Sequence, residues 1–185
     1  MDDQIALWVF GYGSLMWDPG FAFSQRQVAC LPGWHRSFCM KSIHYRGTPE
    51  DPGLVLALDR AEGAACDGVA FGVEGPAAAA TLAYLHQREL ISDAYLETRL
   101  PVVLADGRVV TAVTYVIDHA HPQYCAGLTS DEQAAIIARC AGQTGTNADY
   151  LWNTTAHLAE LGLADPDLDW LSARVRTLQA GTSPG

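Results

Sequence analysis

Residues 7–15 read Leu7-Trp8-Val9-Phe10-Gly11-Tyr12-Gly13-Ser14-Leu15, a short apolar strand that runs into a glycine loop. The glycines permit backbone angles closed to other residues, so such a loop can point several amide N–H groups at one anion. A dinucleotide-binding fingerprint would place a third glycine where Met16 stands and would continue as a helix, and neither is present. The stretch therefore disfavours a Rossmann fold. On spacing alone, a tight turn that simply requires glycine is the plainer interpretation.

Short strands continue on the carboxyl side of this loop. Val, Ile, Leu and aromatic runs bounded by Gly, Pro and Asp predict strands over residues 7–11, 28–31, 34–43, 54–59 and 68–73. Pro76 suits the first position of a helix that extends to about Leu90. Two further strands, 95–104 and 109–116, are predicted on either side of an Asp106-Gly107 hairpin turn.

The last third of the chain carries the capping residues of three helices. Thr129 and Glu132 have the spacing of a capping box before the run from Ala134 to Cys140. We expect Gly142 to end this helix, Asn147 to cap the next, Gly162 to stop it, and Asp165-Pro166 to start the last.

The predicted order is strands with one embedded helix, followed by a helical C-terminal third. This order is typical of α+β proteins, whereas a dinucleotide-binding fold alternates strand and helix. We therefore predict a mixed β-barrel or curved sheet surrounded by helices. A chain of 185 residues is long enough for one domain, so residues 1–185 are taken as a single domain. The small polar tail from about residue 180 is predicted to be disordered.

The composition excludes several classes of partner. Eleven Lys and Arg against 21 Asp and Glu give a formal charge of −10, which disfavours nucleic acid and anionic lipid surfaces. No run approaches the ~20 apolar residues that span a bilayer, and the start, Met1-Asp2-Asp3, lacks the basic region of a secretory signal. We therefore predict a cytoplasmic protein with no membrane and no nucleic-acid partner.

The cysteines and histidines indicate neither a disulfide framework nor a metal site. Five cysteines form an odd set without a C-x-x-C pair, and we interpret them as reduced, mostly buried thiols. His119 and His121 could share one face of an extended segment, but no further ligand stands at a usual spacing. We predict no metal and no cofactor.

Several blocks of sequence resemble the ChaC-like γ-glutamylcyclotransferases. The segment 9–17, Val-Phe-Gly-Tyr-Gly-Ser-Leu-Met-Trp, is similar to the opening signature of that family. Four later blocks follow in the family's order, at residues 42–53, 84–89, 121–124 and 142–151. The family often has Ser and Pro where this chain has Thr144 and Thr146, which concerns the shape of that loop rather than the chemistry.

The resemblance implies an enzyme, a lyase that cleaves glutathione to 5-oxo-L-proline and L-cysteinylglycine. It implies that the free α-amine of the γ-glutamyl group attacks its own γ-carbonyl, so that no metal or thiol is needed. It assigns substrate binding to the backbone around Val9, Phe10, Gly11, Tyr12, Gly13, Ser14 and Leu15, with Tyr150 as a further pocket residue, and it assigns general base and acid catalysis to Glu89. Whether the loop amides hold the oxyanion or the α-carboxylate stays open.

The residues around Glu89 fit that role. On a helix after Pro76, Leu82, Leu85 and Glu89 fall on one stripe, which should face the core. A carboxyl group in apolar surroundings has a raised pKa and can both accept and return a proton. Without the resemblance, an ion pair with Arg88 at the helix end is the simpler interpretation.

Other interpretations of single residues stay open. Glu97, which could instead pair with Arg99 on one strand face, is the second choice for the essential carboxylate. Tyr150 could be a half-buried tyrosine at a helix start, and Arg46 could attract the anionic peptide or be an exposed loop residue.

Two other functions are compatible with the same residues. The loop would recognise the γ-glutamyl part alone, so the substrate could be another γ-glutamyl amine or dipeptide. The chain could also be a non-catalytic regulatory protein that binds γ-glutamyl compounds, as the family's older link to cation transport suggests.

Overall fold

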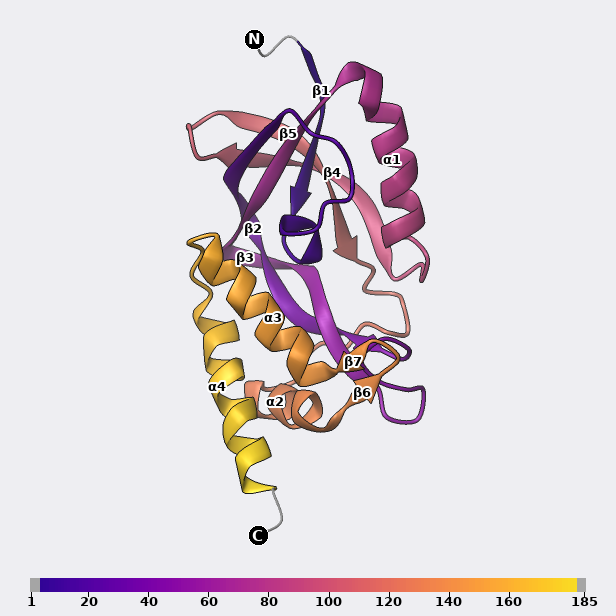
Figure 1. The fold of residues 1–185 in the computed structure, drawn as a ribbon, viewed down its shortest axis with the longest axis vertical. Helices are drawn as coiled ribbons and strands as arrows, with labels where there is room; N and C mark the ends of the chain where they lie inside the picture. Colours follow the sequence, from indigo (N-terminus) through magenta and orange to yellow (C-terminus); the bar gives the residue numbers. More distant parts are fainter. Residues whose placement is uncertain (1–3, 183–185) are drawn as a thin grey trace. The chain divides into compact units, whose positions relative to one another are not determined.

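A computed structural model describes residues 4–182, and its strands form a closed barrel. The order around the barrel is β1-β3-β2-β4-β5 (Figure 1). β1 is antiparallel to β3, β4 is antiparallel to β5, and a parallel pairing of β1 with β5 closes the sheet. The strands are β1 Ile5–Gly11, β2 Gln25–Ser42, β3 Gly53–Glu74, β4 Tyr95–Leu104 and β5 Val109–Ile117. The prediction of a mixed barrel is confirmed.

Two of the strands are longer than the sequence predicts. The predicted strands 28–31 and 34–43 form the single 18-residue β2, and 54–59 and 68–73 form the single 22-residue β3. Gly33 and Gly63, which look like strand ends in the sequence, take positive φ angles of 84° and 78° inside these strands. Glycine tolerates that conformation, so the strand bends and continues along its neighbour instead of ending.

The chain divides into two compact units. The first comprises Met1–Arg36 and Ala57–His121, and the second comprises Ser37–Leu56 and Pro122–Gly185. Most of the barrel and helix α1, Gly75–Glu89, belong to the first unit. The single domain stays a prediction of the sequence.

The two faces of β1 belong to two different apolar clusters in the first unit. Val9 packs with Val113, Tyr115 and Leu85 of α1, so this face lies under the helix. Phe10, the next residue, packs with a separate set of barrel residues that includes Leu31, Leu58, Ala70 and Val102. Successive side chains of a strand point to opposite faces, so β1 is buried on both. Its carboxyl end is therefore held rigidly where the glycine loop begins.

The second unit contains the three predicted C-terminal helices, α2 Ser130–Arg139, α3 Asn147–Glu160 and α4 Pro166–Gly181, which pack on one another. Two caps are confirmed. Thr129 and Glu132 form a capping box, with Thr129 Oγ1 accepting from Glu132 N at 3.2 Å and Glu132 Oε2 accepting from Thr129 N at 2.7 Å. Asp165 Oδ1 accepts from Leu168 N at 3.2 Å. Gly162, with φ 71°, follows the end of α3 as predicted.

Two predicted helix boundaries are wrong. α2 ends at Arg139, and Gly142 instead lies in a small hairpin of β6 Ala141–Gly142 and β7 Gly145–Thr146. A Cβ at Gly142 would lie 2.5 Å from the Tyr45 carbonyl carbon, so glycine serves a close backbone approach there. The cap of α3 is Thr146, whose hydroxyl accepts from Asp149 N at 3.0 Å, and Asn147 is the first helical residue.

None of the helices within residues 4–182 is both long and apolar enough to cross a membrane. The cytoplasmic location stays a prediction of the sequence. α4 runs to Gly181, and the end of the predicted disordered tail, 183–185, lies outside the described residues.

Candidate active site

The glycine loop turns back on the end of β1. Tyr12 and Gly13 lead into a single 3-10 turn, Ser14–Met16, in which Met16 N donates to Gly13 O at 2.9 Å and Asp18 N donates to Ser14 O at 2.9 Å. A Cβ on Gly11 would lie 2.9 Å from Leu15 Cβ, so this return requires glycine. The first N–H groups of a helical turn lack partners within it. Within residues 4–182, no protein group accepts from Ser14 N or Leu15 N.

Arg36 holds the loop through its main chain, and no sequence pattern pointed to this residue. Its guanidinium donates from Nη1 to Tyr12 O at 2.6 Å and from Nη2 to Asp67 O, and only 9% of the residue is exposed. The Tyr12 hydroxyl donates to Tyr115 O at 2.9 Å. Both the carbonyl and the side chain of Tyr12 are thus fixed by residues distant in the sequence, which no local pattern reveals.

Val9 and Phe10, assigned to substrate binding by resemblance, are fully buried in the two apolar clusters. Their side chains are therefore occupied by packing. Any contact with a ligand near this end of β1 would use the main chain that follows them. This agrees with a loop that recognises its ligand through backbone N–H groups.

Glu89 is the last residue of α1, and its side chain is 18% exposed. Leu85, one turn earlier on the same stripe, is fully buried, and Leu82 packs against the same apolar cluster. Loss of hydration raises the pKa of the Glu89 carboxyl group, and the positive charge of Arg88 opposes this in part. The helix thus presents a largely desolvated carboxyl group, as the stripe predicts.

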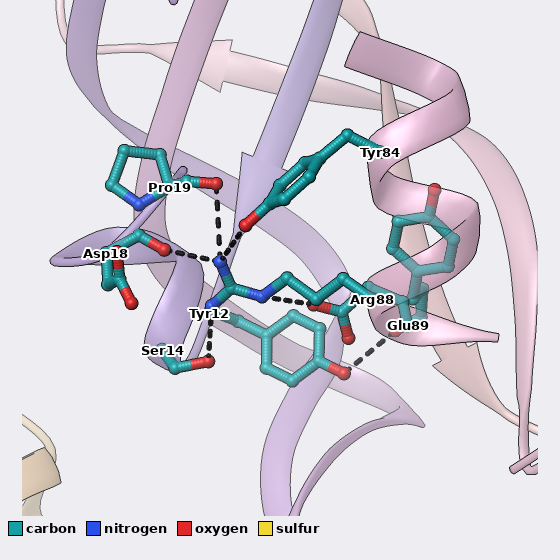
Figure 2. Close-up of polar contacts among 8 residues, drawn as sticks. Tyr12, Ser14, Asp18, Pro19, Tyr84, Arg88 and Glu89 are labelled. Atoms are coloured by element: carbon teal, nitrogen blue, oxygen red, sulfur yellow. Dashed lines mark hydrogen bonds and ion pairs between the residues drawn. The ribbon is translucent and has the colours of Figure 1, made fainter. Parts of the chain in front are cut away.

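Arg88 brings the end of α1 to the glycine loop. Its Nε lies 3.3 Å from Glu89 Oε1, so the ion pair considered as the simpler interpretation of Glu89 does form. The same guanidinium donates to Ser14 Oγ at 3.0 Å and to Asp18 O at 2.6 Å (Figure 2). The predicted catalytic carboxyl group and the predicted binding loop are therefore joined through one side chain.

A second set of polar contacts, close to Glu89, joins Tyr115, Glu97 and His86. The hydroxyl of buried Tyr115 donates to Glu97 Oε2 at 3.1 Å, and His86 Nε2 lies 2.5 Å from the same oxygen. Burial, followed by the negative charges of Glu97 and Glu89, raises the pKa of Tyr115, so this phenol stays protonated. Glu97, the second choice for the essential carboxylate, is engaged by Tyr115 and His86, and the pairing with Arg99 that the strand pattern suggested is not the contact observed.

Tyr150 belongs to the second unit. Its hydroxyl accepts a hydrogen bond from Leu56 N at 3.2 Å, and its ring lies edge to face with Phe38 at 6.0 Å. The Arg46 guanidinium lies 5.5 Å from the ring centroid. These contacts give Tyr150 and Arg46 structural partners within that unit, and a role for either in substrate binding stays a prediction.

Solved structures with this fold define the class of protein. The fold matches a yeast crystal structure titled as a γ-glutamyl cyclotransferase specific to glutathione, with a TM-score of 0.84 and 24% identity over 96% of this chain and 99% of that one. A second crystal structure of the yeast protein matches with a TM-score of 0.81 and 25% identity, over 94% and 99% of the two chains. The fold is that of the γ-glutamylcyclotransferases, and the predicted fold is confirmed.

Residues 7–178 match the model of the family described as ChaC-like protein, and the chain belongs to that family. A glutathione-specific γ-glutamylcyclotransferase of Escherichia coli K12 is 38% identical over 182 residues, which cover 98% of this chain and 78% of the relative. A protein of Danio rerio, glutathione-specific γ-glutamylcyclotransferase 1, is 35% identical over 168 residues, 89% of this chain and 83% of that protein. The resemblance found in the sequence is confirmed.

Proposed function

We propose that this protein is a glutathione-specific γ-glutamylcyclotransferase, a lyase that converts glutathione to 5-oxo-L-proline and L-cysteinylglycine. The observation that carries the proposal is a desolvated carboxyl group, Glu89, tied through Arg88 to a loop with free N–H groups. The relatives from Escherichia coli and Danio rerio are named as glutathione-specific enzymes, which supports the choice of glutathione.

The reaction needs little beyond orientation and proton transfer. The α-amine nitrogen of the γ-glutamyl group bonds to its own γ-carbonyl carbon, and the C–N bond to cysteine breaks. Two protons leave the α-ammonium, one before and one after its nitrogen attacks, and Glu89 transfers them to the departing amine, which leaves as an ammonium. No water is consumed. Orientation of such an intramolecular attack can contribute roughly 7–11 kcal/mol, and positioned proton transfer contributes about 10²–10⁴-fold in rate.

The loop supplies the neutral donors that this reaction requires. Ser14 N and Leu15 N belong to a turn whose return is fixed by Gly11 and whose start is held by Arg36. Preorganised amides stabilise a developing oxyanion, or a bound carboxylate, without being rearranged during the reaction. We assign binding of the γ-glutamyl part to this loop, and the proton transfers to Glu89.

The substrate and the catalytic activity are tested together. The purified protein is incubated with reduced glutathione and, separately, with γ-glutamyl-alanine, and 5-oxoproline is detected by mass spectrometry. We expect release of 5-oxoproline and cysteinylglycine from glutathione. Faster release from γ-glutamyl-alanine would make the protein a cyclotransferase for other γ-glutamyl compounds. Binding of glutathione with no product from either compound would make it a non-catalytic binding protein.

The raised pKa of Glu89 predicts the acidic limb of the pH profile. A base acts only when ionised, so kcat/KM should fall as the pH drops through the pKa of this group. Because burial raises that pKa, the midpoint of the limb is expected above the ordinary value of 4.5. The measurement is initial-rate kinetics from pH 4 to 8 at low glutathione concentration. A midpoint at or below the ordinary value would contradict the assignment of Glu89 as the base.

A further inference from the structure

The Arg88 guanidinium has five partners among residues 4–182, and they come from two segments. Three are in the stretch that follows β1, and two are on the last turns of α1 (Figure 2). Nη1 donates to Asp18 O at 2.6 Å, Pro19 O at 3.3 Å and Tyr84 Oη at 3.0 Å, Nη2 donates to Ser14 Oγ at 3.0 Å, and Nε lies 3.3 Å from Glu89 Oε1.

This arrangement depends on the shape of arginine. A guanidinium presents five N–H donors in a rigid planar fork, whereas a lysine presents three donors on one flexible nitrogen. Acceptors as divergent as Ser14 Oγ and Glu89 Oε1 can be reached together by the fork and not by a single ammonium nitrogen. The Arg88 side chain is only 20% exposed, so little water competes for these bonds.

A second observation places the same two segments in close contact. Gly20 has a φ of 74°, and a Cβ built on it would lie 2.0 Å from the Tyr84 hydroxyl oxygen. The backbone after the glycine loop therefore passes directly against the Tyr84 side chain of α1, and its positive φ favours glycine at this position. Tyr84 also accepts a hydrogen bond from Arg88, so this contact and the Arg88 guanidinium hold the same stretch against the same helix.

We infer that Arg88 is a positioning residue that clamps the loop after β1 against the Glu89 carboxylate and so sets the distance between the bound γ-glutamyl group and its base. This inference rests on the proposed function. Arg88 has a second effect, because its charge favours ionised Glu89 against the loss of hydration. Tyr84 and Asp18 are titratable residues that contact Arg88 directly. Further titratable groups linked to this site are Tyr115 of β5, Glu97 of β4 with its partner His86, and Tyr12 of the loop.

Two substitutions separate the geometry from the charge. Arg88→Lys keeps the charge and loses the fork, so kcat should fall roughly tenfold or more, toward the ~10²-fold that a misplacement of about 1 Å can cost. The midpoint pH of the acidic limb of its kcat/KM profile should equal that of the wild type. Arg88→Met loses both, so kcat should fall at least as far and the limb should move to higher pH. Arg99→Lys, the same change at an exposed position of β4, should leave both quantities unchanged.

Hydrogen–deuterium exchange tests the clamp without any activity. We expect the amides of residues 13–20 to exchange faster in Arg88→Lys than in the wild type, and to be unaffected in Arg99→Lys. Wild-type kcat together with wild-type exchange in Arg88→Lys would overturn the inference. If the wild type releases no 5-oxoproline while Arg88→Lys still loosens the loop, the proposed function fails and the clamp stands. Should Arg88→Met not fold, the Arg88→Lys result decides alone.

Discussion

Replacement of Glu89 by glutamine is expected to slow turnover of glutathione by at least ~10²-fold, or about 2.7 kcal/mol of activation free energy. Glutamine keeps the size of the side chain and can still accept a hydrogen bond from Arg88, but it cannot take a proton from the α-ammonium. The loop amides and their supports are untouched by the change. Binding of glutathione, measured by calorimetry, should therefore stay close to that of the wild type while kcat falls.

Two matched carboxylate variants show whether the effect belongs to Glu89. Glu74→Gln lies at the opposite, exposed end of the same helix and should leave kcat unchanged. Glu97→Gln tests the alternative base, and it should change kcat less than Glu89→Gln because Glu97 is engaged by Tyr115 and His86. Near-normal turnover by Glu89→Gln, with a normal Tm, would remove Glu89 from the mechanism. A larger loss in Glu97→Gln would transfer the role to Glu97.

Replacement of Asn147 by alanine is expected to destabilise the second unit by about 3 kcal/mol. The Asn147 side chain is fully buried, and its amide bridges both backbone groups of Leu54, accepting from N and donating to O at 2.7 Å each. A buried backbone group left without a partner costs roughly 1–3 kcal/mol, and alanine would leave two of them. The backbone of Gly53 also packs against the Asn147 side chain, because a Cβ at Gly53 would lie 2.8 Å from Asn147 Oδ1.

The measurement is urea unfolding followed by circular dichroism. Asn153→Ala is the matched control, since Asn153 is exposed on the same helix α3 and should cost no more than a few tenths of a kcal/mol. A loss below about 1 kcal/mol in Asn147→Ala would mean that the Leu54 groups find other partners.

The elements that the sequence predicts well are those governed by neighbours along the chain. The capping box of Thr129 and Glu132, the cap of Asp165 and the hairpin at Asp106-Gly107 all depend on contacts within a few residues. Gly107 has the positive φ of 87° that such a turn requires. In each case all the groups that form the cap or turn lie within a few residues of one another, so the residue pattern alone predicts it.

The predictions that are wrong concern two residues that contact partners distant in the sequence and two glycines inside long strands. Asn147 has the chemistry of a helix cap, but its amide is used by Leu54, and Thr146 caps the helix instead. Gly142 has the chemistry of a helix end, but it is needed where the backbone of Tyr45 passes. Gly33 and Gly63 look like strand ends, yet β2 and β3 continue through them. At Asn147 and Gly142 a contact with residues distant in the sequence outweighs a local preference, and at Gly33 and Gly63 glycine adopts a positive φ without ending the strand.

By itself, the sequence determined the order of the elements, the glycine loop after β1, the stripe that turns Glu89 inward and the resemblance to the ChaC-like family. These follow from residue types and spacings along one stretch of chain. Only the tertiary structure decided that Arg36 supports Tyr12 and that Tyr115 lies between Glu97 and the loop. It also decided that Arg88 spans the loop and the helix. A hydrogen bond requires two groups within about 3 Å, and for residues dozens of positions apart that distance is fixed by the packing of the whole barrel.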